Sequence, residues 1–193
     1  YLNSGRVDSL EKVCDDELLQ EKWAYRDAWR YVDTRTEWEE RDNIDLSVII
    51  PLYNSEKFLE KCIGRFTAQK TDYKFEVILV NDGSKDSCGE IIDYYGGRDH
   101  RIIPVHKENG GVSDARNTGM AYSSGDYTFF VDGDDWIDLT LVKRLVERIE
   151  QDNADIVQTS YYYAYRDYLL YDERFEKRDD PPTVLDNQQV MKE

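Results

Sequence analysis

The sequence predicts an α/β fold in which helices flank a mainly parallel sheet. From Leu46 onward, short apolar segments alternate with segments of helical periodicity. The apolar segments are continuous rather than alternating, which is typical of strands buried on both faces. Polar residues follow the apolar segments directly. Strands that alternate with helices imply right-handed crossovers and a parallel sheet, so these 193 residues predict one α/β domain with a short extension.

The pattern predicts each element in order. Strands are expected at residues 47–51, 75–80, 101–105, 127–131 and 154–160. Helices are expected after Asn54-Ser55 and at residues 86–95, 113–123 and 139–150. Residues 161–176 alternate aromatic and polar side chains, which predicts a hairpin around Asp167-Tyr168 packed on the sheet edge; the alternative is that its tyrosines line an acceptor groove. A last helix is expected to begin at residues 186–193.

The N-terminal region differs in texture from the rest. Apolar residues recur at loosely helical spacing between Leu10 and Val32, and residues 37–45 form a charged linker. We therefore expect a helical extension over 1–45 and the α/β domain over 46–193. The extension either packs on the domain or leads in from an upstream module. A partner-binding or membrane-surface helix is the alternative, although its acidic polar face disfavours an anionic membrane.

Composition excludes several function classes. The net charge of −16, with Lys and Arg scattered along the chain, argues against a nucleic-acid partner. Cys14, Cys62 and Cys88 lack zinc-site spacing and predict reduced, partly buried thiols. There is no signal peptide, and no apolar run approaches the ~18 residues of a membrane span. We expect a cytoplasmic protein, with the inner face of the membrane as a further location, and an excised or processed piece, because the chain starts at Tyr1.

Polar segments follow four of the predicted strands. They are Tyr53-Asn54, residues 81–84, residues 109–117 and residues 132–135. Ligands of open parallel sheets bind at the carboxyl ends of the strands. Segments distant in the sequence should therefore meet at one edge and form a binding site.

The acidic turn Asp132-Gly133-Asp134-Asp135 is the most informative of these segments. Three carboxylates in four residues repel one another unless a cation neutralises them. Carboxylate oxygens suit Mg²⁺ or Mn²⁺, and Mg²⁺ often combines one or two carboxylates with substrate phosphates. Gly133 would leave room for a ligand. The alternative is a solvated acidic turn near a helix start, where carboxylates favour the helix dipole.

Three other side chains are candidates for nucleotide contacts. Asp82 could accept the N–H of a base or a ribose hydroxyl, although Asp-Gly is also ordinary turn chemistry. Tyr53 could stack on a base, or it is a rim aromatic. Arg116 could reach a diphosphate, or it forms a structural ion pair. The sequence has neither a dinucleotide-binding glycine motif nor a P-loop.

Four ordered stretches together resemble the family 2 glycosyltransferases, inverting enzymes of the GT-A (Rossmann-like) fold. The stretches are residues 47–54 (Ser-Val-Ile-Ile-Pro-Leu-Tyr-Asn), 77–84 (Val-Ile-Leu-Val-Asn-Asp-Gly-Ser), 110–119 (Gly-Gly-Val-Ser-Asp-Ala-Arg-Asn-Thr-Gly) and 127–136 (Tyr-Thr-Phe-Phe-Val-Asp-Gly-Asp-Asp-Trp). The resemblance implies a nucleotide-diphosphate sugar donor, most often UDP-linked, and Mn²⁺ or Mg²⁺ as cofactor. It covers about residues 46–160.

The resemblance also implies roles for individual residues. Pro51 and Tyr53 would begin the nucleotide pocket, and Asp82 matches the aspartate that contacts the base. Asp132 and Asp134 match the D-x-D motif, with Asp132 directed to the ribose or metal and Asp134 as metal ligand. By position, Gly133 joins the nucleotide-sugar site, Asp135 is an outer carboxylate, Arg116 lies in the A-R-N-x-G stretch, and Asn117 is a structural residue.

The implied reaction transfers the sugar to an acceptor hydroxyl with inversion, in bacterial polysaccharide or glycan synthesis. The acceptor could be a glycan, a lipid-linked glycan or a protein. The family's catalytic base follows the D-x-D motif, and no counterpart is identified here; Asp172 and Glu173 are candidates only because they are acidic. The acceptor side is therefore expected to be truncated, with a further domain elsewhere in the polypeptide.

Two alternatives remain open. A nucleotidyltransferase-like enzyme would need a glycine-rich basic loop after the first strand, where residues 52–56 read Leu-Tyr-Asn-Ser-Glu. A non-catalytic donor-binding module is favoured by the unidentified base, but the clustered carboxylates of the D-x-D stretch favour a working donor site.

Overall fold

The computed structural model describes residues 10–13, 43–159, 161–164 and 169–172. The chain divides into two units, one formed by residues 32–153 and the other by residues 1–31 and 154–193. Each unit is described by itself.

A four-stranded parallel sheet forms the centre of the first unit. Its strands are β2 (Leu46–Leu52), β3 (Phe75–Asp82), β4 (Ile102–Lys107) and β5 (Tyr127–Phe130), in the order β4-β3-β2-β5. The helices are α2 (Glu56–Thr67), α3 (Cys88–Gly96), α4 (Val112–Tyr122) and α5 (Leu141–Asp152). The predicted α/β class and the first four predicted strands are confirmed.

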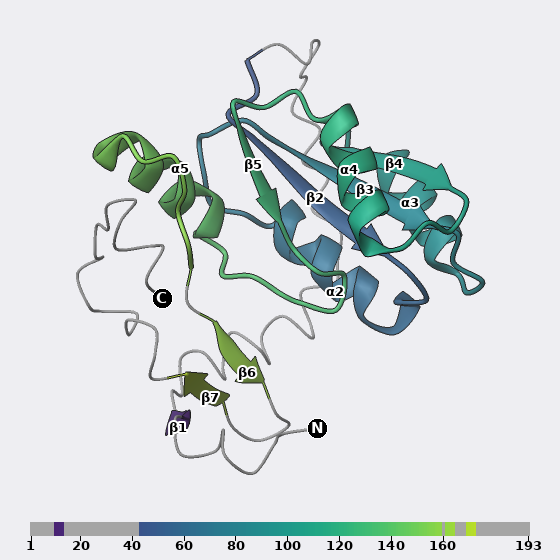
Figure 1. Ribbon diagram of the computed structural model, residues 1–193, viewed down its shortest axis with the longest axis horizontal. Helices are drawn as coiled ribbons and strands as arrows, with labels where there is room; N and C mark the ends of the chain where they lie inside the picture. The colour runs from purple at the N-terminus through teal and green to yellow at the C-terminus, as the bar shows by residue number, and fades with distance from the viewer. Residues whose placement is uncertain (1–9, 14–42, 160, 165–168, 173–193) are drawn as a thin grey trace. The chain divides into compact units, whose positions relative to one another are not determined.

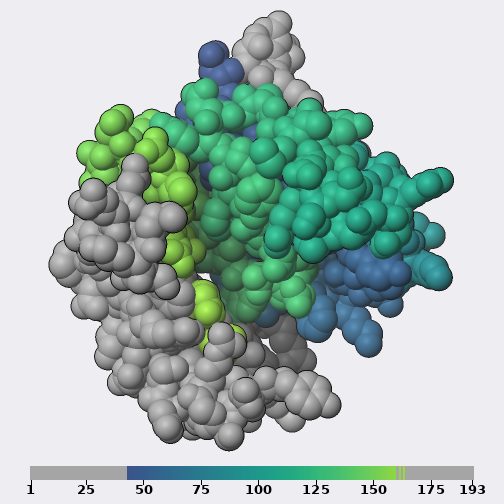
Figure 2. Space-filling model, in the orientation of Figure 1, coloured from purple at the N-terminus to yellow at the C-terminus, as the bar shows by residue number. Residues whose placement is uncertain are grey.

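The helices cover both faces of this sheet. The connections through α2 and α3 step from β2 to β3 and on to β4, whereas the connection through α4 steps back past β3 and β2 to β5. Right-handed crossovers therefore place α2 and α3 together on one face and α4 on the other, as Figure 1 shows. In Figure 2, teal and green residues from the α4 and β5 region cover most of the described surface on this side of the molecule.

Close packing of α4 on the sheet depends on a glycine. All eight residues of β3 are buried, and Ile49 and Val80 belong to a core cluster that includes Ala115 of α4. A Cβ atom at Gly119 would overlap Cγ2 of Ile49. The backbone of α4 can approach β2 and β3 this closely because residue 119 has no side chain.

The strand order reverses between β2 and β5. To one side of β2 lie β3 and β4, in chain order, and β5 pairs with the other side of β2. Such a reversal is the topological switch point at which open α/β sheets bind ligands. The carboxyl ends of β2 and β5 carry Tyr53 and the acidic turn at Asp132.

The second unit contains a small antiparallel sheet. Its strands are β1 (Leu10–Val13), β6 (Tyr162–Ala164) and β7 (Leu169–Asp172), in the order β1-β7-β6. Antiparallel pairing of β6 with β7 confirms two paired strands within residues 161–176, and the turn expected around Asp167-Tyr168 lies outside the described residues. Leu10 and Val13, which the helical spacing assigned to a helix, instead lie in β1, because pairing with β7 satisfies their backbone. The other residues of the expected N-terminal helices, and the helix expected at 186–193, lie outside the described residues.

The fifth predicted strand is wrong for residues 154–159, which form no strand. The apolar run around Ile156 suggested a buried strand, yet Ile156 is 81% exposed. A strand of this kind is stabilised by side-chain burial rather than by its own propensity. Without a covering surface, the apolar pattern alone does not produce the strand.

Two further expectations concern cysteines and membranes. Cys62 and Cys88 are free and buried, as predicted, and Cys14 lies outside the described residues. In the described part of the chain, no helix has both the length and the apolar character to cross a bilayer.

Candidate functional site

The loops that follow β2 and β3 are joined by backbone-to-side-chain hydrogen bonds. The amide of Asn54 donates to Oγ of Ser84 (3.1 Å), and the amide of Lys85 donates to Oδ1 of Asn54 (2.9 Å). Asn54 adopts a left-handed backbone, with φ of 53°, which asparagine tolerates better than most residues. This backbone turns the chain at the end of β2.

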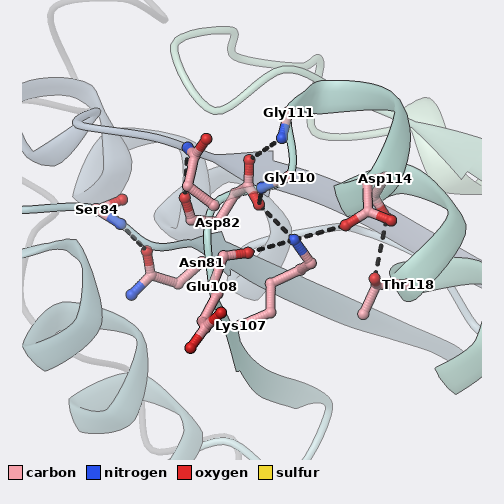
Figure 3. Close-up of polar contacts among 10 residues, drawn as sticks. Asn81, Asp82, Ser84, Lys107, Glu108, Gly110, Gly111, Asp114 and Thr118 are labelled. Atoms are coloured by element: carbon pink, nitrogen blue, oxygen red, sulfur yellow. Dashed lines mark hydrogen bonds and ion pairs between the residues drawn. The ribbon is translucent and has the colours of Figure 1, made fainter.

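Asp82, the last residue of β3, joins the second loop to the third. Its carboxylate is almost fully buried and accepts hydrogen bonds from the amides of Gly110 to Oδ1 and Gly111 to Oδ2, both at 2.8 Å. Nζ of Lys107 lies 2.6 Å from Oδ1 (Figure 3). Burial alone would raise the pKa of Asp82, but Lys107 and the two amides outweigh it and hold this pKa below its usual range. Asp82 is therefore an ionised carboxylate that can only accept hydrogen bonds.

The third loop is joined to the acidic turn by an ion pair. Nη2 of Arg116, on α4, lies 2.8 Å from Oδ1 of Asp132, and its guanidinium carbon lies 5.9 Å from the centroid of the Phe130 ring. Nε of Arg116 is buried without a hydrogen-bond partner. The structural ion pair considered for Arg116 is thus present, and it brings a cation to the carboxylate turn.

The acidic turn packs against the end of β2. The side chains of Asp132, Asp134 and Asp135 are exposed, whereas Gly133 is buried against β2. A Cβ atom at Gly133 would overlap Cδ2 of Leu52 and lie 3.5 Å from the carbonyl oxygen of Pro51. The described structure therefore gives Gly133 a packing role against the first loop.

The four polar segments consequently form a closed circuit at one edge of the sheet. We use the term loop circuit for the contacts that run from Asn54 to Ser84, from Asp82 to Gly110 and Gly111, from Arg116 to Asp132, and from Gly133 back to Leu52. Tyr53, which follows β2 beside this circuit, is half-exposed, and Pro51 lies in β2 opposite Val80.

Negative charge accumulates where the circuit closes. Partial shielding of its carboxyl, with Asp134 and then Asp132 nearby, raises the pKa of Asp135. Burial, followed by the charges of Asp135 and Asp134, raises the pKa of the Cys62 thiol on α2 to about 12. Burial is the larger cause of both shifts, and the negative charges of the acidic turn add to it.

The carboxylates suit a metal shared with a ligand better than a cage made of protein alone. Among the described residues, no group of three or more His, Cys, Asp or Glu side chains is arranged to hold a metal. Asp132 already pairs with Arg116, while Asp134 is exposed at the turn. Mg²⁺ commonly uses only one or two carboxylates and completes its shell with water and phosphate oxygens. This donor set fits that mode of binding.

Lys107 and Asp114 are site residues that sequence reasoning missed. Lys107 lies two residues beyond the predicted end of its strand, because β4 extends to Lys107 rather than ending at Val105. The rule that placed Asp82 at a strand end applies equally to Lys107 once the strand is given its full length. Asp114 could not be found in this way, since its link to Lys107 is a tertiary contact.

Parallel strands, both faces covered by helices and polar loops gathered at the switch point define an α/β domain of the GT-A-like class. The chain belongs to glycosyl transferase family 2, whose family model matches residues 47–189.

Several bacterial proteins are similar to this chain in sequence. The uncharacterized glycosyltransferase EpsJ of Bacillus subtilis is 45% identical over 126 residues, covering 65% of this chain and 36% of the relative. Glycosyltransferase GlyA of Streptococcus pneumoniae is 39% identical over 148 residues, covering 74% of this chain and 21% of the relative. This chain therefore spans only a fifth to about a third of the length of these relatives.

Solved structures show the same fold. The structure of S. aureus TarS 1–349 in complex with UDP matches with a TM-score of 0.53 and 29% identity, over 57% of this chain and 33% of that TarS chain. The TarS 1–349 complex with UDP-GlcNAc matches with a TM-score of 0.53 and 30% identity, over 57% of this chain and 32% of that TarS chain.

Proposed function

We propose that this domain binds a UDP-sugar at the loop circuit, with Mn²⁺ or Mg²⁺, and that the protein transfers the sugar to an acceptor hydroxyl with inversion. The observation that carries the proposal is that an acceptor-only carboxylate, Asp82, and a cation–carboxylate pair, Arg116 and Asp132, lie on one loop circuit. The first suits a base and the second suits a diphosphate. The likeness to TarS, crystallised with UDP and UDP-GlcNAc, supports this reading.

Each residue has a role that its chemistry suits. Asp82 accepts a ring N–H of the base, and Tyr53 offers an exposed ring for stacking. Arg116 donates to the diphosphate through guanidinium N–H groups not used by Asp132. Asp134, with Asp132, would hold the metal. When bound there, a divalent cation stabilises the negative charge that develops on the leaving diphosphate.

Transfer of the sugar also requires a group that activates the acceptor. A carboxylate base is needed to deprotonate the attacking hydroxyl, and the sequence does not identify it. Teichoic acid synthesis is named for one relative, GgaB of Bacillus subtilis, which is 34% identical over 130 residues. We propose a bacterial surface polysaccharide or related glycan as the product.

Titration calorimetry with UDP tests the donor site. We expect binding with Mn²⁺ present and a loss of about tenfold or more in affinity when EDTA removes it. Asp134→Ala should lose the metal-dependent part while its melting temperature stays unchanged, because Asp134 is exposed. Asp126→Ala is the matched control, since Asp126 is an exposed aspartate at the amino end of β5.

Three outcomes would contradict the proposal. Absence of UDP binding removes the donor site, metal-independent binding removes the metal, and normal metal-dependent binding by Asp134→Ala removes that ligand assignment. CDP should bind more weakly than UDP, because cytosine presents an acceptor where uracil presents a ring N–H.

A further inference from the structure

Lys107 is held by three oxygen atoms from three segments. Its Nζ lies 2.6 Å from Oδ1 of Asp82, 2.6 Å from Oδ2 of Asp114 and 2.5 Å from the carbonyl oxygen of Glu108 (Figure 3). An ammonium group has three donors, so every donor of Lys107 is used inside the protein. The Lys107 side chain is only 17% exposed. It acts as a crosslink rather than as a free surface charge.

Because of this crosslink, the two carboxylate oxygens of Asp82 accept different numbers of hydrogen bonds. Among the residues that the structure describes, Oδ1 accepts from both Lys107 and Gly110, whereas Oδ2 accepts from Gly111 alone. A carboxylate has about two acceptor positions on each oxygen. Oδ1 is therefore saturated, and Oδ2 keeps one acceptor position for a further donor.

The loop is shaped around the same ion pair. A Cβ atom at Gly110 would overlap the carboxylate of Asp114 and lie 2.9 Å from Nζ of Lys107. Gly111 has a φ of 89°, which disfavours any residue with a side chain. Both glycines thus allow the backbone to close on Asp82 and Lys107.

We propose that Lys107 is a positioning residue, which fixes the Asp82 carboxylate and the Gly110–Gly111 backbone so that Oδ2 of Asp82 is the atom offered to the nucleotide base. This inference rests on the proposed donor site. Because Asp114 lies in the first turn of α4, the same lysine also anchors the helix that carries Arg116. One side chain therefore sets the spacing between the base-contacting and diphosphate-contacting groups.

Amide hydrogen exchange and UDP calorimetry on the full chain test this role. In Lys107→Met, the amides of Gly110 and Gly111 should exchange at least about tenfold faster, and UDP affinity should fall by about tenfold or more. Lys107→Arg keeps a cation and should restore most of both. Lys143→Met, which removes an exposed lysine paired with Glu147 on α5, should change neither.

The pH profile separates positioning from general destabilisation. The charged groups that face Asp82 are Lys107 from β4 and, through it, Asp114 from α4. Removing Lys107 should move the acid limb of UDP binding to higher pH, because Asp82 loses the cation that lowers its pKa. Asp114→Asn keeps Lys107 beside Asp82 and removes only a nearby negative charge, so the acid limb should not move to higher pH in this variant.

The results distinguish the inference from the proposed function. If the unmodified chain does not bind UDP, the proposed function fails, while exchange at Gly110 and Gly111 still reports on the Lys107 crosslink. If Lys107→Met exchanges and binds as the unmodified chain does, or if affinity falls without a shift of the acid limb, the positioning role is overturned.

Discussion

Close packing explains why some positions in this domain are glycine, including one beside the candidate site. Gly119 touches Ile49 across the α4–sheet interface, and Gly133 touches Leu52 at the end of β2. The sequence suggested that Gly133 leaves space for a ligand, and the structure places Cδ2 of Leu52 where a Cβ atom of residue 133 would stand. At residue scale, a motif glycine can therefore report helix or loop packing even when it lies beside a candidate site.

The Gly119 contact predicts a clear loss of stability in Gly119→Ala. Alanine favours a helix interior by about 1 kcal/mol over glycine, but overpacking a rigid core costs ~1–3 kcal/mol. We expect a net decrease in the free energy of unfolding, measured by urea denaturation. Gly97→Ala is the control: its Cβ would meet nothing closer than 3.4 Å, so stability should stay equal or rise. Equal changes in the two variants would refute the packing argument.

At the scale of elements, the sequence predicted the buried strands correctly, but it was wrong for segments whose structure depends on tertiary partners. Residues 46–52 and 75–82 are mainly apolar and almost entirely buried, so their sequence pattern indicates the environment that they occupy. Residues 154–159 have a similar pattern without the burial, and β1 has helical spacing but pairs with β7. Such differences arise from tertiary partners, which a single sequence does not display.

The candidate site divides in the same way. Strand-end placement predicted that Asp82, Arg116 and Asp132 belong to one edge, because the topology alone brings strand ends together. The ion pair from Lys107 to Asp114 depends on side-chain directions and on the full length of β4. Local pattern therefore predicted the position of the site but not its internal contacts.

The end of α5 provides a prediction at this scale. Asn153 caps the helix in a left-handed conformation, with φ of 48° and ψ of 46°. Asn153→Gly should equal or exceed the unmodified chain in stability, whereas Asn153→Ala should lose about 1 kcal/mol, because a Cβ atom is strained there. Thermal denaturation of both variants followed by circular dichroism measures this, and a more stable alanine variant would exclude a left-handed cap.

At the scale of the whole molecule, the charge of −16 makes acidity the dominant electrostatic feature. Lowering the pH relieves mutual repulsion among the carboxylates. It also protonates carboxylates that the fold uses as anions, and Asp82 is the most buried of those at the candidate site. These two effects oppose each other, so a comparison of variants is needed to separate them.

The ionised carboxylate of Asp82 should stabilise the folded state near neutral pH and lose that effect in acid. Its folded pKa lies below its unfolded value of about 3.9. Its contribution is therefore present above that unfolded value and is lost as the pH falls through the folded pKa. Urea unfolding between pH 6 and about 3 should show a steeper loss of stability for the unmodified chain than for Asp82→Asn. Parallel profiles would mean that Asp82 carries no such linkage.

The loop circuit has a consequence for ligand binding. Each of its four loops is restrained by two neighbours, so no loop can swing outward without breaking contacts on both of its sides. We therefore expect independent opening of one loop on the nanosecond scale to be suppressed, and opening to involve several loops together. If a nucleotide binds at this edge, the fold has already met most of the entropic cost of ordering the loops, so less of the binding free energy is lost to that ordering.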